Sequence, residues 1–159
     1  MNETDLDLGA IGIVPQSARS LGQTLSKIKN GSRRRMANGA LRDRSRPSLD
    51  KFQSTINFSD TYPPAFDNIE QGDVLLVSCV AELSGMAGKP FGRLPVPGSV
   101  IWRTTEGHRV PSGPDETVAP EGAAFYTYKP ILEMMVDGWD VDTDEYGAIV
   151  TASLVLMET

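Results

Sequence analysis

The stretch Val74-Leu75-Leu76-Val77-Ser78-Cys79-Val80-Ala81 decides the fold class of this chain. Apolar residues occupy both alternating sets of positions along it, and a turn sequence, Gln71-Gly72-Asp73, comes directly before it. A strand that is apolar on both faces is typical of the middle of a sheet, because both faces are then covered. We therefore predict a central β-strand here and a mainly β fold around it.

Alternating apolar and polar residues predict further strands on both sides of this run. These strands are expected within residues 52–58, 100–103, 125–128, 132–136 and 148–157. In the last of them, the inward set is either Ala148, Val150, Ala152, Leu154 and Leu156 or the opposite phase. The spacing of the strands and the polar turns between them predict an antiparallel β-sandwich or β-barrel core over residues 52–159.

Two segments rich in glycine and proline interrupt this core. They cover residues 84–98 and 104–121, and we expect both to be long loops. Loops of this length are uncommon in a compact domain unless they pack on neighbouring subunits or bind a ligand. We prefer packing on neighbours, because the N-terminal part of the chain also has the character of an assembly segment.

Residues 1–51 differ from the rest of the chain in charge and in apolar content. Between Arg19 and Lys51 there are ten Lys/Arg and two acids, a local charge of +8, whereas the remainder has five Lys/Arg against nineteen acids, or −14. A segment with so little apolar surface does not order itself alone. We predict a basic, largely irregular assembly arm over residues 1–51 that becomes ordered on the acidic surface of a neighbouring copy.

Two local patterns in this arm predict structure. Leu21, Leu25 and Ile28 recur at helical spacing, so residues 17–29 form either a short helix or a coil. Asn38-Gly39 is a signal for a type I′ turn, which predicts a small hairpin near residues 35–42. Around this turn lie the residues that we assign as donors to a neighbouring subunit: Arg33, Arg34, Arg35, Arg42 and Arg44.

The run from Glu133 to Glu145 holds six acids and no base. Part of it, Asp140-x-Asp142-x-Asp144, is similar to the opening of an EF-hand loop, but the sixth and twelfth positions lack the required Gly and Glu. An irregular Ca²⁺ site and a solvated acidic turn are two alternatives. We prefer a third, an acceptor for the arginine arm through Arg–carboxylate pairs. The acceptor residues are Asp140, Asp142, Asp144 and Glu145.

No pattern in the chain indicates catalysis, so we expect a non-enzymatic protein with no cofactor and no metal. The only histidine, His108, lies in a Gly/Pro-rich segment, and the chain has no Gly-x-Ser-x-Gly motif. The only cysteine, Cys79, lies in an apolar run and is expected to be a buried, inert thiol. Residues 85–90 are similar to a phosphate-binding loop but lack its spacing, and Pro90 prevents the helix that such a loop needs.

Partners other than protein are also disfavoured. The arginines are able to contact a nucleic-acid backbone, but little aromatic interleaving and a net charge of −6 argue against a dedicated nucleic-acid binder. No long apolar stretch predicts a membrane span. The acidic N-terminus is not typical of a secretory signal.

Three stretches resemble small structural proteins of tailed bacteriophage virions. They are residues 34–39 running into 52–56, residues 62–66 through 72–74 to 78–83, and residues 128–134 followed by 144–148. The resemblance is one of pattern and covers about residues 34–83 and 128–157. It implies a component of the neck or tail, such as a connector, collar, tail-tube or tail-hub subunit, whose arms and loops clasp neighbouring subunits in a ring.

The residues and the resemblance together predict a structural subunit of a virion, assembled in the host cytoplasm. Its partners are expected to be copies of itself in a symmetric ring or tube, together with other neck or tail proteins. The alternative is a virion-borne module that binds a host surface or a carbohydrate. Exposed aromatic residues in the two long loops would favour this alternative, but the loops offer Phe91 and little else that is aromatic, which counts against it.

Overall fold

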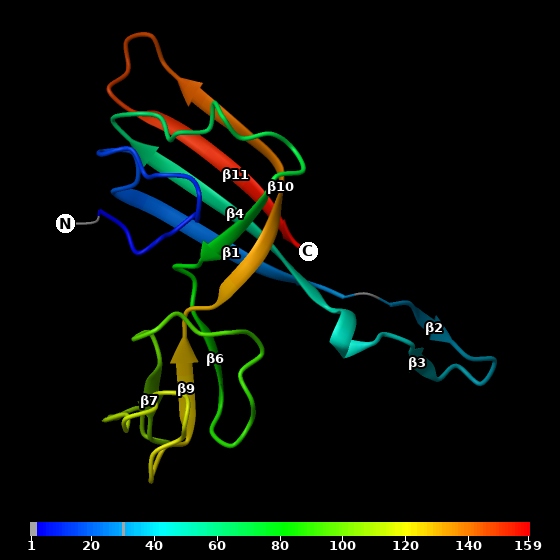
Figure 1. Ribbon diagram of the computed structural model, residues 1–159. Coiled ribbons are helices and arrows are strands. Elements are labelled where there is room, and N and C mark those ends of the chain that lie inside the picture. The colour runs from blue at the N-terminus through cyan, green and yellow to red at the C-terminus, as the bar shows by residue number, and fades with distance from the viewer. Residues whose placement is uncertain (1–2, 30) are drawn as a thin grey trace.

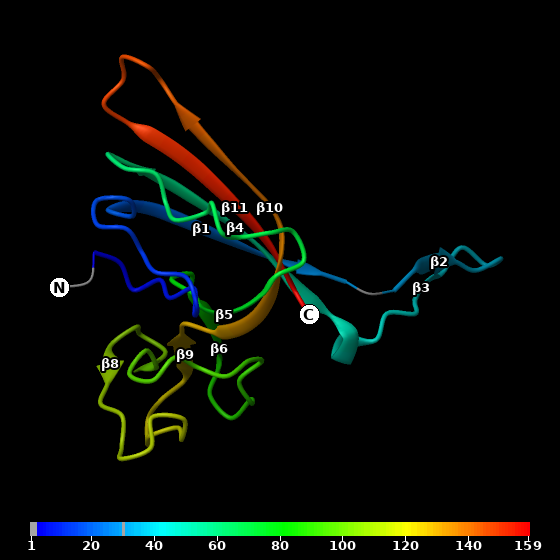
Figure 2. The ribbon, with the colours of Figure 1, turned by 45° about the horizontal axis from the view of Figure 1, so that its top comes forward.

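The computed structural model describes residues 3–29 and 31–159, and its largest unit is a curled, five-stranded antiparallel sheet (Figure 1). In spatial order its strands are β1 (Ser20–Ile28), β4 (Lys51–Asp60), β11 (Val150–Glu158), β10 (Ile131–Thr143) and β5 (Val74–Ser78). The prediction of a mainly β, antiparallel fold is confirmed, and the sheet has the form of an open half-barrel (Figure 2).

One face of this sheet carries the main hydrophobic core. Alternate residues point into it, and in β11 these are Val150, Ala152, Leu154 and Leu156. This settles the phase of the last strand in favour of the first set, except that Ala148 precedes β11 and is exposed. Full burial of an aliphatic side chain contributes roughly 1.5–3 kcal/mol. The other strands supply Ile56, Phe58, Leu75, Val77, Leu132, Met134 and Val136.

The apolar run that decides the fold class forms an edge strand, so its predicted central place is wrong. β5 pairs only with β10, and Val74 and Leu76 point away from the core, 49% and 59% exposed. At the end of β5, Asp7 and Ser78 exchange two backbone hydrogen bonds of 3.3 and 2.8 Å. The second apolar face of the run is therefore open surface, which the sequence pattern does not distinguish from a covered face.

Residues 3–28 belong to the folded body, which corrects the predicted boundary of the arm at residue 51. Leu6, Leu8 and Ala18 are buried against the sheet, and β1 is paired with β4 along its whole length. The expected helix or coil is a strand. Leu21 and Leu25 are four residues apart, a spacing that also places two side chains on one face of a strand, and pairing with β4 decides between the two.

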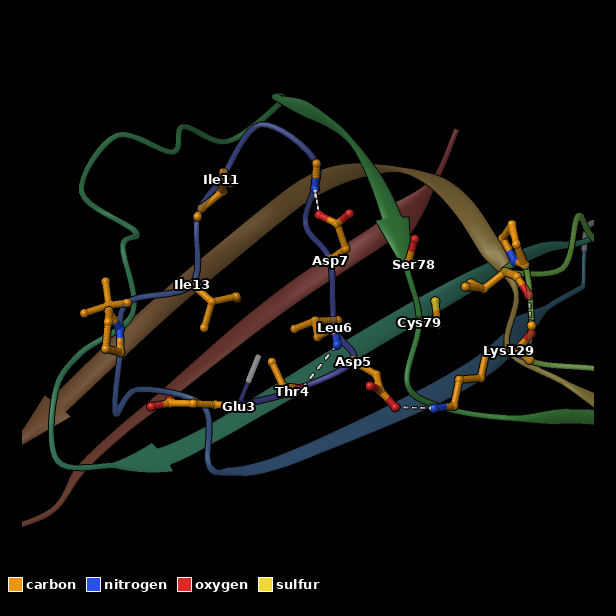
Figure 3. Close-up of a pocket in the computed structure, with 18 residues that line it drawn as sticks. Glu3, Thr4, Asp5, Leu6, Asp7, Ile11, Ile13, Ser78, Cys79 and Lys129 are labelled. Carbon is orange, nitrogen blue, oxygen red and sulfur yellow. Dashed lines mark hydrogen bonds and ion pairs between the residues drawn. The ribbon is translucent and has the colours of Figure 1, made fainter. Parts of the chain in front are cut away.

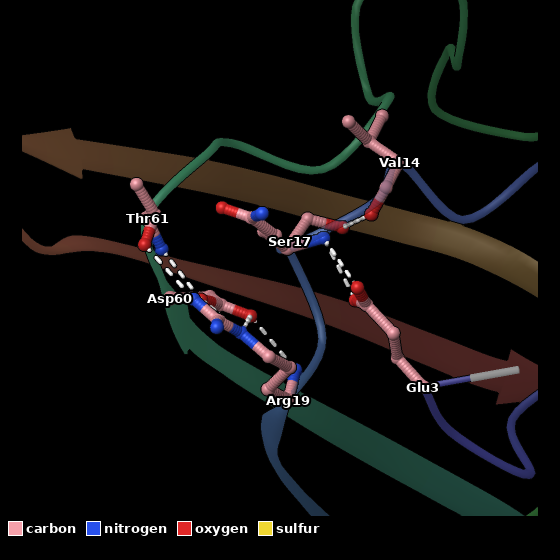
Figure 4. Close-up of polar contacts among 7 residues, drawn as sticks. Glu3, Val14, Ser17, Arg19, Asp60 and Thr61 are labelled. Carbon is pink, nitrogen blue, oxygen red and sulfur yellow. Dashed lines mark hydrogen bonds and ion pairs between the residues drawn. The ribbon is translucent and has the colours of Figure 1, made fainter. Parts of the chain in front are cut away.

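A buried carboxylate fixes the start of β1 (Figure 4). Asp60 accepts hydrogen bonds from the backbone N–H of Arg19 at 2.9 Å and from its guanidinium at 2.6 Å. The pKa of Asp60 lies well below its usual range, mainly because of the hydrogen bond from the Arg19 side chain. The two ends of the paired strands are thus locked together at the end of the sheet away from the arm.

Residues 83–128 form a second, smaller unit with its own aromatic core. Its four strands, in spatial order, are β6 (Leu83–Met86), β9 (Phe125–Tyr128), β7 (Ile101–Arg103) and β8 (Arg109–Val110). Trp102, Tyr126 and Tyr128 are buried in it, and the ring of Phe91 packs 4.5 Å from that of Tyr126. The two predicted long loops therefore contain β6 and β8 and cover a core of their own.

The chain between β1 and β4 leaves the body as an extended hairpin, seen at the right of Figure 1. It contains β2 (Arg33–Arg35), β3 (Leu41–Asp43) and the 3-10 turn η1 (Pro47–Leu49). Within residues 3–29 and 31–159, no helix combines the length and the apolar character needed to cross a membrane.

Candidate assembly interface

The hairpin of β2 and β3 continues the β1–β4 ribbon beyond the sheet, and all residues of both strands are exposed. Its tip is closed by hydrogen bonds from the Gly39 N–H to the Met36 carbonyl at 2.9 Å and from the Met36 N–H to the Ala40 carbonyl at 2.8 Å. The hairpin is as predicted, but the turn is not type I′. Gly39 alone takes a positive φ, of 81°, whereas a type I′ turn also requires one at Asn38.

The pairing register divides the five predicted donors between the two faces of this ribbon. Arg34 lies opposite Arg42, and a backbone hydrogen bond from Arg44 to Ser32 continues the ladder by one step. Since side chains alternate along a strand, Arg34, Arg42 and Arg44 share one face. We call these three residues the arginine face.

The two other donors lie on the opposite face and are engaged within the hairpin. The guanidinium of Arg33 lies 3.8 Å from the carboxylate of Asp43, and that of Arg35 donates to the Gly39 carbonyl at 3.2 Å. The side chains of the arginine face make no hydrogen bond or ion pair within residues 3–29 and 31–159. Like charges directly opposite one another are unfavourable, so an anionic partner would stabilise this face.

The predicted acceptors lie at the tip of the β10–β11 hairpin. Asp142 and Asp140 lie opposite Thr151 and Ser153 on the face of the sheet that carries no core. Asp144 and Glu145 follow in the loop, where the Gly147 N–H donates to the Asp144 carbonyl at 3.1 Å. The structure therefore brings all four acceptors to one end of the molecule.

Two exposed residues with large hydrophobic side chains lie in the same loop, and the sequence analysis, which relied on charge, did not predict them as part of the interface. Tyr146 is 92% exposed and Ile149 is 61% exposed. An aromatic ring among carboxylates offers a surface on which a guanidinium stacks. The sequence Asp144-Glu145-Tyr146-Gly147 is typical of a turn, and turns lie at the surface. This pattern could have predicted that Tyr146 is exposed.

A shallow groove runs along the open face of the sheet beside these acids. It has a volume of about 350 Å³, and Asp140 forms part of its wall. Its floor is made mainly of small and polar residues from three neighbouring strands, β1, β4 and β11: Ser20, Gly22, Asn57, Ser59, Thr151 and Ser153. Backbone or long side chains can therefore approach this part of the sheet closely.

Donors and acceptors occupy opposite ends of the same sheet. The arm leaves the body at Lys51, where β4 begins, whereas Asp60 at the other end of β4 pairs with Val150 beside the acidic loop. A strand of this length spans about 33 Å. Figures 1 and 2 both show the two tips pointing away from each other. The arginine face and the acidic tip of one chain therefore do not meet.

The base of the arm is fixed to the body by Arg93. Its guanidinium binds Glu158 at the end of β11, with an Nη2–Oε2 distance of 2.9 Å, and donates to the Asp50 carbonyl at 3.0 Å. It also lies 5.2 Å from the ring centroid of Phe52. Burial acts to raise the pKa of Glu158, but the hydrogen bonds from Arg93 and from the Phe52 N–H outweigh it and lower the pKa.

A cavity of about 910 Å³ lies between the N-terminal segment and the loop before Val100 (Figure 3). Its charged groups already have partners. Glu3 accepts hydrogen bonds from the Gln16 N–H at 2.7 and 2.8 Å, and Asp5 pairs with Lys129 at 2.8 Å. These contacts attach the N-terminal segment to the body and offer no reactive group.

The remaining chemical candidates are His108 and Cys79. His108 is exposed, and its nearest charged partner is Glu106 at 3.5 Å. Cys79 is buried, and burial raises the pKa of its thiol to about 11. Within the described part of the chain, no group of three or more His, Cys, Asp or Glu is placed to hold a metal ion.

Comparison of the chain with protein families, with curated proteins and with solved structures finds no match.

Proposed function

We propose that this protein is a structural subunit that assembles head to tail into a ring or tube in the neck or tail of a tailed-phage virion. The main observation behind the proposal is that the arginine face and the acidic tip, formed by Asp140, Asp142, Asp144 and Glu145, lie at opposite ends of one sheet. The resemblance of residues 34–83 and 128–157 to small neck and tail proteins supports the virion as its setting.

The separation of the two tips favours a heterologous contact between copies. In such a contact, two different surfaces of the subunit bind each other, so each added copy leaves the same surface free for the next one. The assembly then either closes into a ring or continues as a helical filament. Bidentate pairs between the arginine face and Asp140, Asp142, Asp144 and Glu145 give this contact geometric specificity. The direct contacts are expected to weaken as ionic strength rises, because the paired groups are exposed.

The alternative of a carbohydrate-binding module has no support from the long loops. Phe91, its main aromatic candidate, packs edge-on against Trp102 and Tyr128 and forms part of the small aromatic core. The ring faces that a sugar would need are used inside the protein.

Charge reversal tests the proposal. One variant carries Arg34→Glu and Arg42→Glu on the arginine face, and a second carries Asp142→Lys and Asp144→Lys on the acidic tip. We expect each variant to remain monomeric in sedimentation velocity under conditions in which the unmodified chain associates. A mixture of the two should associate, because an acidic arm then meets a basic tip and a basic arm meets an acidic tip.

The matched control reverses two charges on the other face of the same hairpin, Arg33→Glu and Arg35→Glu. It changes the net charge by the same amount as the first variant and should weaken association less than that variant does, because Arg33 and Arg35 are already engaged within the hairpin. The proposal would be refuted if the arginine-face variant alone and the acidic-tip variant alone both associate as strongly as the unmodified chain. Salt-sensitive binding of the unmodified chain to duplex DNA, lost in the Arg34/Arg42 variant, would replace it with nucleic-acid binding.

A further inference from the structure

The outer part of β10 has a free backbone edge. β5 pairs with β10 only from Ile131 to Met135, and the last contacts on that side join Val136 to Asp73 at 2.8 Å and to Gly72 at 2.9 Å. From Gly138 to Thr143, β10 pairs with β11 on one side, and no backbone group of residues 3–29 or 31–159 pairs with it on the other. Such an edge is a template for an added strand.

A β-bulge between Val136 and Gly138 sets which groups point outward. The N–H and C=O groups of Val136 are directed away from β11, since both bond to the segment before β5. In an antiparallel strand this direction alternates, and the extra residue of the bulge shifts the alternation by one. The backbone groups of Trp139, Val141 and Thr143 therefore point to the free side. The Trp139 side chain donates to the Ile69 carbonyl at 3.0 Å, which holds this part of the strand in place.

Charge distinguishes this edge from the opposite edge of the sheet. β1 forms that opposite edge, and its neighbourhood carries the cations Arg19 and Lys27. Carboxylates flank the free part of β10 instead: Asp137, Asp140, Asp142 and Asp144. Trp139 and Val141 add apolar surface there, 40% and 37% exposed. A basic, partly apolar strand therefore complements β10 and not β1.

The hairpin of a second copy meets these requirements. β2 consists of three arginines followed by Met36, which is 43% exposed, whereas β3 contains Asp43, which the carboxylates of β10 would repel. We infer that β2 of one copy adds to the free edge of β10 in the next, so that the sheet continues from one subunit into its neighbour. This inference rests on the proposed head-to-tail assembly and specifies the contact within it.

The six residues from Gly138 to Thr143 offer about 20 Å of edge, enough for a three-residue strand and its flanking residues. The added strand follows β5 along the same side of β10, so the two do not compete for the same backbone groups. Strand addition supplies main-chain hydrogen bonds for affinity, while the arginine–carboxylate pairs fix the register.

A proline at the centre of the free edge tests this inference. Val141→Pro removes one outward N–H, and proline is tolerated where that N–H faces solvent. We expect circular dichroism like that of the unmodified chain but association weakened about tenfold or more. The matched control, Val141→Thr, keeps the N–H and the β-branched shape, and it should associate like the unmodified chain.

Hydrogen exchange on the unmodified chain gives a second measurement that does not depend on the proline variant folding. Assembly should slow exchange at the amides of Trp139, Val141 and Thr143 about tenfold or more relative to the monomer. Assembly without this protection, or a folded Val141→Pro variant that assembles normally, overturns strand addition. If charge reversal still blocks assembly in that case, the head-to-tail proposal stands and only side chains make the contact. If charge reversal has no effect, both ideas fail.

Discussion

At the scale of single residues, Arg93 ties together segments that are far apart in the sequence. It joins the small aromatic unit to Glu158 in the last strand and to Asp50 at the base of the arm. Its own side chain is 27% exposed, but that of Glu158 is only 9% exposed. Removing the guanidinium would therefore leave a largely buried carboxylate without its main partner.

We expect Arg93→Ala to lower the free energy of unfolding by about 2 kcal/mol, the typical size for hydrogen bonds to a charged group whose partner becomes unsatisfied. Urea denaturation followed by tryptophan fluorescence measures this loss. Arg109→Ala is the control, because Arg109 is exposed and lies in the same small unit; it should stay within about 0.5 kcal/mol of the unmodified chain. Equal effects of the two substitutions would show that Arg93 has no special role.

Two carboxylates also determine how stability depends on pH. The pKa values of Asp60 and Glu158 are lowered in the folded state, by Arg19 and by Arg93 against the opposing effect of burial. A carboxylate with a lowered folded-state pKa stabilises the fold fully above its unfolded value, and this contribution is lost as pH falls below it. The urea midpoint should therefore fall steadily from pH 5 to pH 3. Asp60→Asn should give a shallower dependence, and an unchanged slope would contradict this assignment.

At the scale of elements, the sequence predicted strands best where one face is buried and the other is polar. β4 and β9 lie where alternation placed them. The prediction was wrong where two structures share one pattern. Residues 20–28 have a spacing compatible with helix and strand, and long-range pairing with β4 decides. A strand that is apolar on both faces gives the same pattern whether its second face is buried or open, and in β5 Val74 and Leu76 on that face stay exposed.

The candidate interface was only partly predictable for the same reason. Charge counts identified the basic hairpin and the acidic loop, because runs of like charge are visible in the sequence alone. The division of the arginines into a free and an engaged face depends on the register of Arg34 with Arg42, and the outward direction of Val141 depends on one bulge. Both are properties of strand pairing, which no local pattern specifies.

At the scale of the whole molecule, the structure moves the boundary of the arm. A neighbour-binding arm over residues 1–51 would be removable as one piece. Instead, residues 3–28 supply Leu6, Leu8 and Ala18 to the core and the edge strand β1. The removable part lies between Lys29 and Asp50, the residues that follow the last β1–β4 pair, Ile28 with Lys51. Residues 3–28 thus serve the fold, and the proposed contact with a neighbouring copy belongs to the adjacent hairpin.

A deletion of the hairpin can test whether it is needed for association but not for folding. Replacing residues 30–49 with a two-residue Asn-Gly turn should close β1 and β4 into a short hairpin. Because the deleted strands β2 and β3 are exposed, the free energy of unfolding should change by less than about 1 kcal/mol, while association in sedimentation velocity should be lost. Deleting residues 1–28 instead should abolish cooperative unfolding, because it removes a strand and part of the core. A shortened chain that still assembles would show that the hairpin is not the element that joins the subunits.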